Sequence, residues 1–129
     1  MNILLDTCAI LYLSLEDSCV SSSTRAHLQA AARIWVSPIS CAELACLQER
    51  QRIELRGHWK PWLRLAIEKN GWEVQPISLE IVEEAYSLPG KFHADPADRI
   101  LTATARRENL LLLTTDRKLL DYPHVTAGW

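Results

Sequence analysis

Short apolar runs alternate with longer helical segments along this chain, and this alternation limits the fold more than any other feature. The runs that we expect to be strands are residues 3–5, 34–37, 74–77 and 110–114. A strand followed by a helix and then by another strand is typical of a parallel sheet covered by helices. We therefore predict an α/β fold in a single domain, residues 1–129.

The predicted helices are bounded by ordinary start and stop signals. Asp95-Pro96 opens the clearest helix, and Asn70-Gly71 closes another. Pro76 lacks an amide donor, so the strand that contains it is expected at or near an edge of the sheet. The predicted helices span residues 7–15, 24–32, 40–50, about 61–70, 79–88, 96–108 and 116–120.

The composition is that of an ordinary globular protein, with 48% hydrophobic residues, 23% charged residues and a net charge of −2. No apolar run approaches the roughly 20 residues that a membrane helix needs. The N-terminus lacks the basic region of a signal peptide, so we expect a cytoplasmic protein with no membrane partner. The four cysteines have neither zinc-site nor redox-motif spacing, and we interpret them as small buried apolar residues: Cys8, Cys19, Cys41 and Cys46.

Four acidic residues lie near predicted helix starts and strand ends. Asp6 follows the first predicted strand, Glu43 comes shortly after the second, and Asp116 follows the fourth. Asp98 lies at the start of the helix that leads to the fourth strand. Because open parallel sheets bind ligands beyond the carboxyl ends of their strands, these carboxylates are expected to converge. Converging carboxylates form an oxygen-rich site suited to Mg²⁺ or Mn²⁺.

Helix capping is the competing explanation for these acids. Ser40 and Glu43 have the spacing of a capping box, and Asp95 precedes a proline at a helix start. Asp6 and Asp116 have the position of N-caps. A helix N-terminus stabilises a carboxylate by about 0.3–1 kcal/mol, which does not cancel the repulsion among several neighbouring acids. A divalent cation does cancel it, so the joint arrangement favours a metal site.

Four segments of the chain, in this order and spacing, resemble PIN domains, and in particular the VapC toxins of bacterial type II toxin–antitoxin pairs. The resemblance covers essentially the whole chain. The segments that carry it are Ile3–Ala9, Ser37–Leu44, His93–Arg99 and Leu113–Asp116. It implies a three-layer fold with a central parallel five-stranded sheet flanked by helices. It also implies an endoribonuclease that depends on Mg²⁺ or Mn²⁺, forms a homodimer and is neutralised by a cognate antitoxin.

The resemblance assigns roles to individual residues. Asp6, Glu43, Asp98 and Asp116 match the family's catalytic and metal-binding acids, with Glu43 either a metal ligand or the group that orients or deprotonates water. Cys8 and Ala97 depart from the family pattern without removing an acid. The substrate-binding candidates beside these acids are Thr7, Thr115 and Arg99.

Other residue types carry a weaker signal. The four histidines share no common spacing and are expected to be structural or on the surface. Trp59 and Trp62, one helical turn apart, are interpreted as core residues in preference to base-stacking ones. Basic residues that are either RNA contacts or solvated helix faces form two groups: Arg50, Arg52, Arg56, Lys60 and Arg64, and Arg99, Arg106, Arg107, Arg117 and Lys118.

Two rival functions stay open at this stage. One is a PIN-fold nuclease that processes RNA outside any toxin–antitoxin pair, and the other is a catalytically silent binding module. The presence of all four acids argues against the silent module. Phosphatase and receiver domains also place an aspartate after the first parallel strand, but Cys8 stands where haloacid-type phosphatases need a second aspartate.

Overall fold

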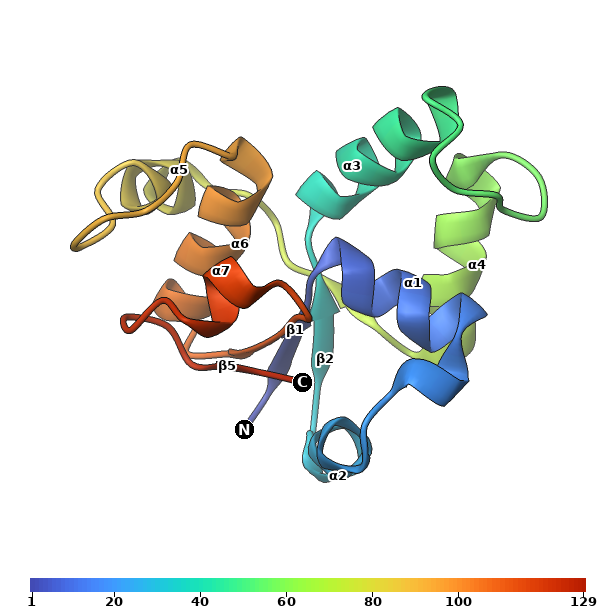
Figure 1. Ribbon diagram of the computed structural model, residues 1–129, viewed down its shortest axis with the longest axis horizontal. Helices are drawn as coiled ribbons and strands as arrows, with labels where there is room; N and C mark the ends of the chain where they lie inside the picture. Colours follow the sequence, from blue (N-terminus) through green and yellow to red (C-terminus); the bar gives the residue numbers. More distant parts are fainter.

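Five parallel strands form one sheet in the computed structural model, which describes all residues from Met1 to Trp129. The sheet order is β3-β2-β1-β4-β5, and every neighbouring pair is parallel (Figure 1). The strands are β1 (Ile3–Leu5), β2 (Ile34–Val36), β3 (Glu73–Val74), β4 (Leu111–Leu113) and β5 (Ala127–Gly128). The predicted parallel α/β fold is confirmed, and the strand that contains Val74 lies at an edge as its neighbouring Pro76 predicted.

Helices cover both faces of this sheet. They are α1 (Thr7–Leu15), α2 (Ser22–Ala30), α3 (Pro38–Glu49), α4 (Trp59–Asn70), α5 (Leu79–Ala85), α6 (Pro96–Arg107) and α7 (Arg117–Leu120), with a 3₁₀ turn at Asp17–Cys19. In Figure 1, α1 and α4 lie to one side of the strands, and α5, α6 and α7 lie to the other. None of these helices is long and apolar enough to cross a membrane.

Alternating side chains of the strands build a separate core on each face of the sheet. Leu5 packs with Ile10 of α1 and Leu44 of α3 on one face. On the other face, Leu112 packs with Leu101 of α6, and all of these side chains are essentially inaccessible to solvent. Burying a leucine or isoleucine stabilises the fold by about 1.5–3 kcal/mol each, so the two cores hold the helices firmly on the sheet.

The register of the strands places their carboxyl ends along one edge of the sheet. Leu5 of β1 pairs with Val36 of β2 and with Leu113 of β4. The next residues, Asp6, Ser37 and Thr114, therefore lie side by side beyond the three central strands. All three are buried.

Several helix boundaries differ from the predicted ones. α3 begins at Pro38 with Ser37 as its N-cap, so the capping box predicted for Ser40 and Glu43 is wrong. α2 begins at Ser22 with Ser21 as its N-cap, two residues earlier than the predicted start at residue 24. The predicted helix at 79–88 ends at Ala85, and the strand predicted at 74–77 covers only Glu73–Val74. The remaining helices begin and end within two residues of their predicted bounds.

Two further predictions about side chains have different outcomes. Trp59 and Trp62 pack against the core on the α1–α3–α4 face, as predicted. The cysteines are all free, but Cys8, Cys19 and Cys46 are exposed, so the prediction that they are buried is wrong.

Candidate metal centre

The sheet edge brings the four predicted acids together. Asp6 follows β1 and caps α1, while Asp116 follows β4 and caps α7. Asp98 lies in the first turn of α6, where it also complements the helix dipole. Glu43 lies in the second turn of α3, one turn further from its helix start than the sequence indicated.

Electrostatic interaction among the acids shows that they share one region. The charges of Asp98 and Glu43 both raise the pKa of Asp6, and the charge of Asp116 raises the pKa of Asp98. Cys8, in the first turn of α1, is affected by all four carboxylates. Although Cys8 as a whole residue is exposed, desolvation of its thiol by neighbouring atoms and then these charges raise the pKa of the thiol to about 11. Helix caps scattered over the surface would not repel one another in this way.

Asp6 is the most buried of the four acids, with only 4% of its surface exposed. Its Oδ1 accepts a hydrogen bond of 2.7 Å from the backbone amide of Ala9, as an N-cap does. Burial raises the pKa of this carboxyl to about 6, more than the hydrogen bonds from Thr114 and Ala9 lower it. Asp6 is therefore both a helix cap and a carboxylate whose charged form is destabilised by burial and by the neighbouring acids.

Glu43 is held by a hydroxyl group of α1. The Thr7 hydroxyl donates a hydrogen bond to Glu43 Oε1, and Thr7 Oγ1 lies 3.0 Å from Ser40 Oγ. Thr7 and Ser40 are both buried, so the Thr7 hydroxyl has a fixed position from which it orients the Glu43 carboxylate. Burial is the main cause of the raised pKa of Glu43, and the Thr7 hydrogen bond partly opposes it. Thr7 therefore contacts an acid of the centre, and its hydroxyl is already engaged.

Asp98 is held by a residue that the sequence did not indicate. His93 Nε2 lies 2.6 Å from Asp98 Oδ2, although histidines were expected to be structural or on the surface. Burial raises the pKa of Asp98, the hydrogen bond from His93 lowers it, and the charges of Asp95 and Asp116 raise it further. Asp95 is the N-cap of α6, as predicted. The only sequence signal for His93 is its place at the start of the segment His93–Arg99, one of the four that carry the family resemblance.

The remaining predicted residues have distinct positions. Asp116 Oδ1 accepts a hydrogen bond from the amide of Lys118, and Thr114 Oγ1 accepts one from the amide of Asp116. Thr115 is half-buried, and its side chain forms no hydrogen bond. The Arg99 guanidinium donates hydrogen bonds to the carbonyl oxygens of Ala85 and Phe92.

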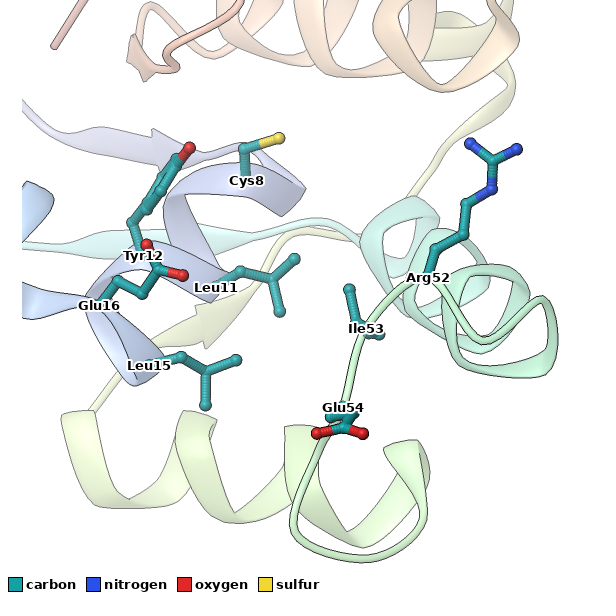
Figure 2. Close-up of a pocket in the computed structure, with 8 residues that line it drawn as sticks. All are labelled: Cys8, Leu11, Tyr12, Leu15, Glu16, Arg52, Ile53 and Glu54. Carbon is teal, nitrogen blue, oxygen red and sulfur yellow. The ribbon is translucent and has the colours of Figure 1, made fainter.

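A cavity of about 380 Å³, lined by five apolar and three charged residues, lies beside Cys8. Cys8 lines one end of it, and Leu11 and Leu15 of α1 face Ile53 from the loop between α3 and α4 (Figure 2). Leu15 is 48% exposed, which is unusual for a leucine on a helix that packs on the sheet. The cavity therefore joins the acidic region to an open apolar surface.

The chemistry of the gathered side chains fits a divalent cation. Asp6, Glu43, Asp98 and Asp116 offer only carboxylate oxygens, which suit Mg²⁺ and Mn²⁺. Their mutual repulsion and the burial of Asp6 are relieved when a cation binds. In this metal-free arrangement, no group of three or more acidic, histidine or cysteine side chains is positioned to hold a metal ion. Mg²⁺ does not need one, since it usually keeps several waters and contacts one or two carboxylates.

These features define a class of parallel α/β domain with an acidic centre at the carboxyl edge of its sheet. The PIN domain family matches residues 3–125 of this chain. The chain belongs to the PIN domain family.

Similar proteins are found by sequence and by structure. Ribonuclease VapC22 of Mycobacterium tuberculosis is 32% identical over 125 residues, which cover 95% of this chain and 93% of that protein. VapBC2 of Rickettsia felis, solved with a DNA fragment from its promoter, aligns over 100% of this chain and 99% of that chain, with a TM-score of 0.72 and 17% identity. A toxin–antitoxin complex from Klebsiella pneumoniae covers 98% and 96%, with a TM-score of 0.68 and 19% identity. At these identities the two structures establish the shared fold.

Proposed function

We propose that this protein is a Mg²⁺- or Mn²⁺-dependent endoribonuclease and the toxin of a type II toxin–antitoxin pair. The observation that carries the proposal is the convergence of four carboxylates at one edge of the sheet, with Asp6 buried and repelled by its neighbours. The sequence relative that is named a ribonuclease supports the same activity.

Each acid has a role in this proposal. Asp6, Asp98 and Asp116 hold the cation, which when bound activates water and stabilises charge on the scissile phosphate. Glu43, oriented by Thr7, either contributes to the same cation or directs the water. The buried setting of Asp6 strengthens its interaction with a bound cation because the local dielectric constant is low.

An exposed basic region supports RNA as the substrate. Its five side chains surround the end of α3, the following loop and the start of α4, and none of them forms an ion pair with an acid. They are Arg50, Arg52, Arg56, Lys60 and Arg64. Arg52 also lines the cavity that reaches Cys8, together with Glu16 and Glu54 (Figure 2). Phosphate contacts of this kind make binding strongly dependent on salt.

The cavity beside the acids is the surface that we assign to the antitoxin. Its apolar lining suits side chains of a protein partner, and a segment bound there would cover the approach to Cys8. Structural neighbours of the chain were solved as toxin–antitoxin complexes. We expect Leu15→Glu to weaken co-purification with the antitoxin and to leave RNA cleavage unchanged, because Leu15 lines the cavity and none of the four acids does (Figure 2).

The test of the activity uses purified protein without antitoxin and total cellular RNA, incubated with Mg²⁺, Mn²⁺ or EDTA. New 5′ ends are mapped by sequencing for wild type, Asp6→Asn and Asp98→Asn. Asp121→Asn is the matched control, because Asp121 is an exposed acid at the end of α7. Discrete cuts that need metal and vanish only in the two site variants support the proposal.

Intact RNA under every condition, from protein with a normal melting curve, would contradict the nuclease and favour a binding module. A second experiment separates the toxin from an RNA-processing enzyme. Expression of the chain alone arrests growth if it is a toxin, and expression of the protein encoded directly upstream restores it. Growth that continues while RNA is processed would favour the processing enzyme.

A further inference from the structure

His93 contacts an acid of the centre from the loop that precedes α6. Its Nε2 lies 2.6 Å from Asp98 Oδ2, and the two side chains are 25% and 15% exposed. An ionised carboxylate only accepts hydrogen bonds, so Nε2 carries the proton and donates it. One oxygen of Asp98 is therefore occupied, and the other is left for a further partner.

Aromatic packing holds the His93 ring in place. The ring stacks on Phe92, with centroids 4.5 Å apart and planes inclined by 17°. Phe92 in turn meets the edge of Tyr122 at 4.9 Å, and the Tyr122 hydroxyl donates a hydrogen bond of 2.6 Å to the carbonyl of Pro89. The loop that carries His93 is thus fastened to the segment after α7.

Arg99 fastens the same loop from the other side. Its guanidinium donates hydrogen bonds of 3.0 Å to the carbonyls of Ala85 and Phe92, and it lies over the rings of Tyr86 and Phe92 at 5.2 and 5.5 Å. Arg99 directly follows Asp98 on α6, so one helix turn carries both the acid and the anchor of the loop that contacts it. This arrangement fixes the imidazole relative to the carboxylate.

We propose that His93 is a positioning residue, which orients the Asp98 carboxylate so that its second oxygen is presented to the divalent cation. The inference rests on the proposed metal centre. Without the imidazole, the Asp98 side chain would rotate freely and the cation would have to order it on binding. Hydrogen-bonding partners of metal ligands typically change metal affinity by about 10–100-fold when they are removed.

The test measures Mn²⁺ affinity by electron paramagnetic resonance, which does not depend on RNA cleavage. Wild type is compared with His93→Ala, which removes the donor, and with His93→Gln, whose amide nitrogen can take the place of Nε2. His27→Ala is the control, because His27 is an exposed histidine on α2. Melting temperatures are recorded in EDTA for all four proteins.

We expect His93→Ala to raise the Kd for Mn²⁺ about 10–100-fold and His93→Gln to stay within about threefold of wild type. The control should bind like wild type. RNA cleavage by His93→Ala should fall at limiting Mn²⁺ and recover at excess Mn²⁺. A purely structural role would not produce this recovery or the rescue by glutamine.

Three outcomes would overturn the inference: unchanged Mn²⁺ affinity in His93→Ala, equal loss in the alanine and glutamine variants, or a wild type that binds no Mn²⁺. Failure of the proposed function looks different. In that case wild type binds Mn²⁺, and the affinity series follows the expected order, but RNA stays intact.

Discussion

The two sides of the metal centre hold their acids in different ways. On the α1–α3 side, Asp6 is buried at the end of β1, and Glu43 is oriented by the hydroxyl of Thr7. On the α6–α7 side, Asp98 is oriented by an imidazole from a loop, and Asp116 caps a helix of only four residues. Both sides lie beyond the same strand ends, but on the second side the contact that orients Asp98 comes from a loop.

The two sides therefore carry different energetic costs: one is the desolvation of a charge, and the other is the ordering of an acid by contacts from a loop. The α1–α3 side concentrates the cost of desolvating a charge, which is visible in the raised pKa of Asp6. The α6–α7 side has more exposed acids, and its order depends on polar and aromatic contacts of the loop before α6. Changes on the first side should therefore affect charge and stability, while changes on the second should affect geometry and metal affinity.

The largest contrast is expected in cleavage by single carboxamide variants. A bound cation contributes several kcal/mol of transition-state stabilisation, and each 1.36 kcal/mol is a factor of ten in rate. We expect Asp6→Asn to lower kcat/KM by about 10³-fold or more and Asp116→Asn by about tenfold, because Asp116 is only half-buried whereas Asp6 is almost fully buried. Cleavage of a single defined RNA under identical Mg²⁺ concentrations measures both. Equal losses would remove the distinction between the two sides.

The stability of the metal-free protein should depend on pH through Asp6. The folded pKa of about 6 lies above the ordinary aspartate value of 3.8, so between these values the folded state binds more protons than the unfolded state. Stability therefore falls as pH rises through this window, by about 3 kcal/mol from this group.

The check is urea unfolding in EDTA at pH 4 and pH 7 for wild type and Asp6→Asn. Asparagine caps a helix as well as aspartate does, so the variant keeps its N-cap and loses only the charge. We expect the variant to be more stable than wild type at pH 7 and to match it near pH 4. A variant that is less stable at pH 7 would mean that Asp6 acts mainly as a charged cap.

Removing the Thr7 hydroxyl should destabilise the α1–α3 side. Thr7→Val leaves the buried Ser40 hydroxyl without its Thr7 partner and leaves Glu43 unrestrained, at a cost of about 1–3 kcal/mol. Thr7→Ser keeps the hydroxyl and should recover most of the loss. Thermal unfolding in EDTA measures both variants, and equal stability of the valine variant and wild type would refute the role of this hydroxyl.

The smallest expected effect concerns the loop anchor on the α6–α7 side. Arg99→Met removes two hydrogen bonds to backbone carbonyls and should lower the free energy of unfolding by about 1–2 kcal/mol. Arg117→Met, in contrast, breaks only an exposed ion pair of 3.6 Å and should change stability little. If Arg99→Met instead leaves stability intact and weakens RNA binding, Arg99 is a substrate contact.

The acids on the α1–α3 side could be predicted from the sequence because strand ends in a parallel sheet have a simple geometry. Asp6 follows an uninterrupted apolar run, and any parallel pairing of that run places it at the carboxyl edge. The first residue of α3 was harder to predict from the sequence, because Ser37 and Ser40 are both acceptable N-caps. The Ser37-Pro38 pair starts the helix, and Ser40 becomes a buried partner of Thr7.

The contact between His93 and Asp98 could not be predicted in the same way. It depends on the path of a loop that Arg99, Phe92 and Tyr122 fasten, and these contacts join residues from separate elements. The hydrogen bond of Thr7 to Glu43 is similar, because it spans 36 residues. Periodicity indicates which elements form, but it contains no signal for side chains that meet across them. β5 also had only a weak signal, since it is a two-residue strand completed by pairing with β4.

The most direct test of a shared centre is a double-mutant cycle in Mn²⁺ binding with Asp6→Asn, Asp98→Asn and the double variant. If the two sides act on the same cation, each single change weakens binding by about 100-fold or more, and the second change adds little to the first. Independent, additive losses, or unchanged binding in either single variant, would show that the two sides do not hold one cation together, and would contradict the account.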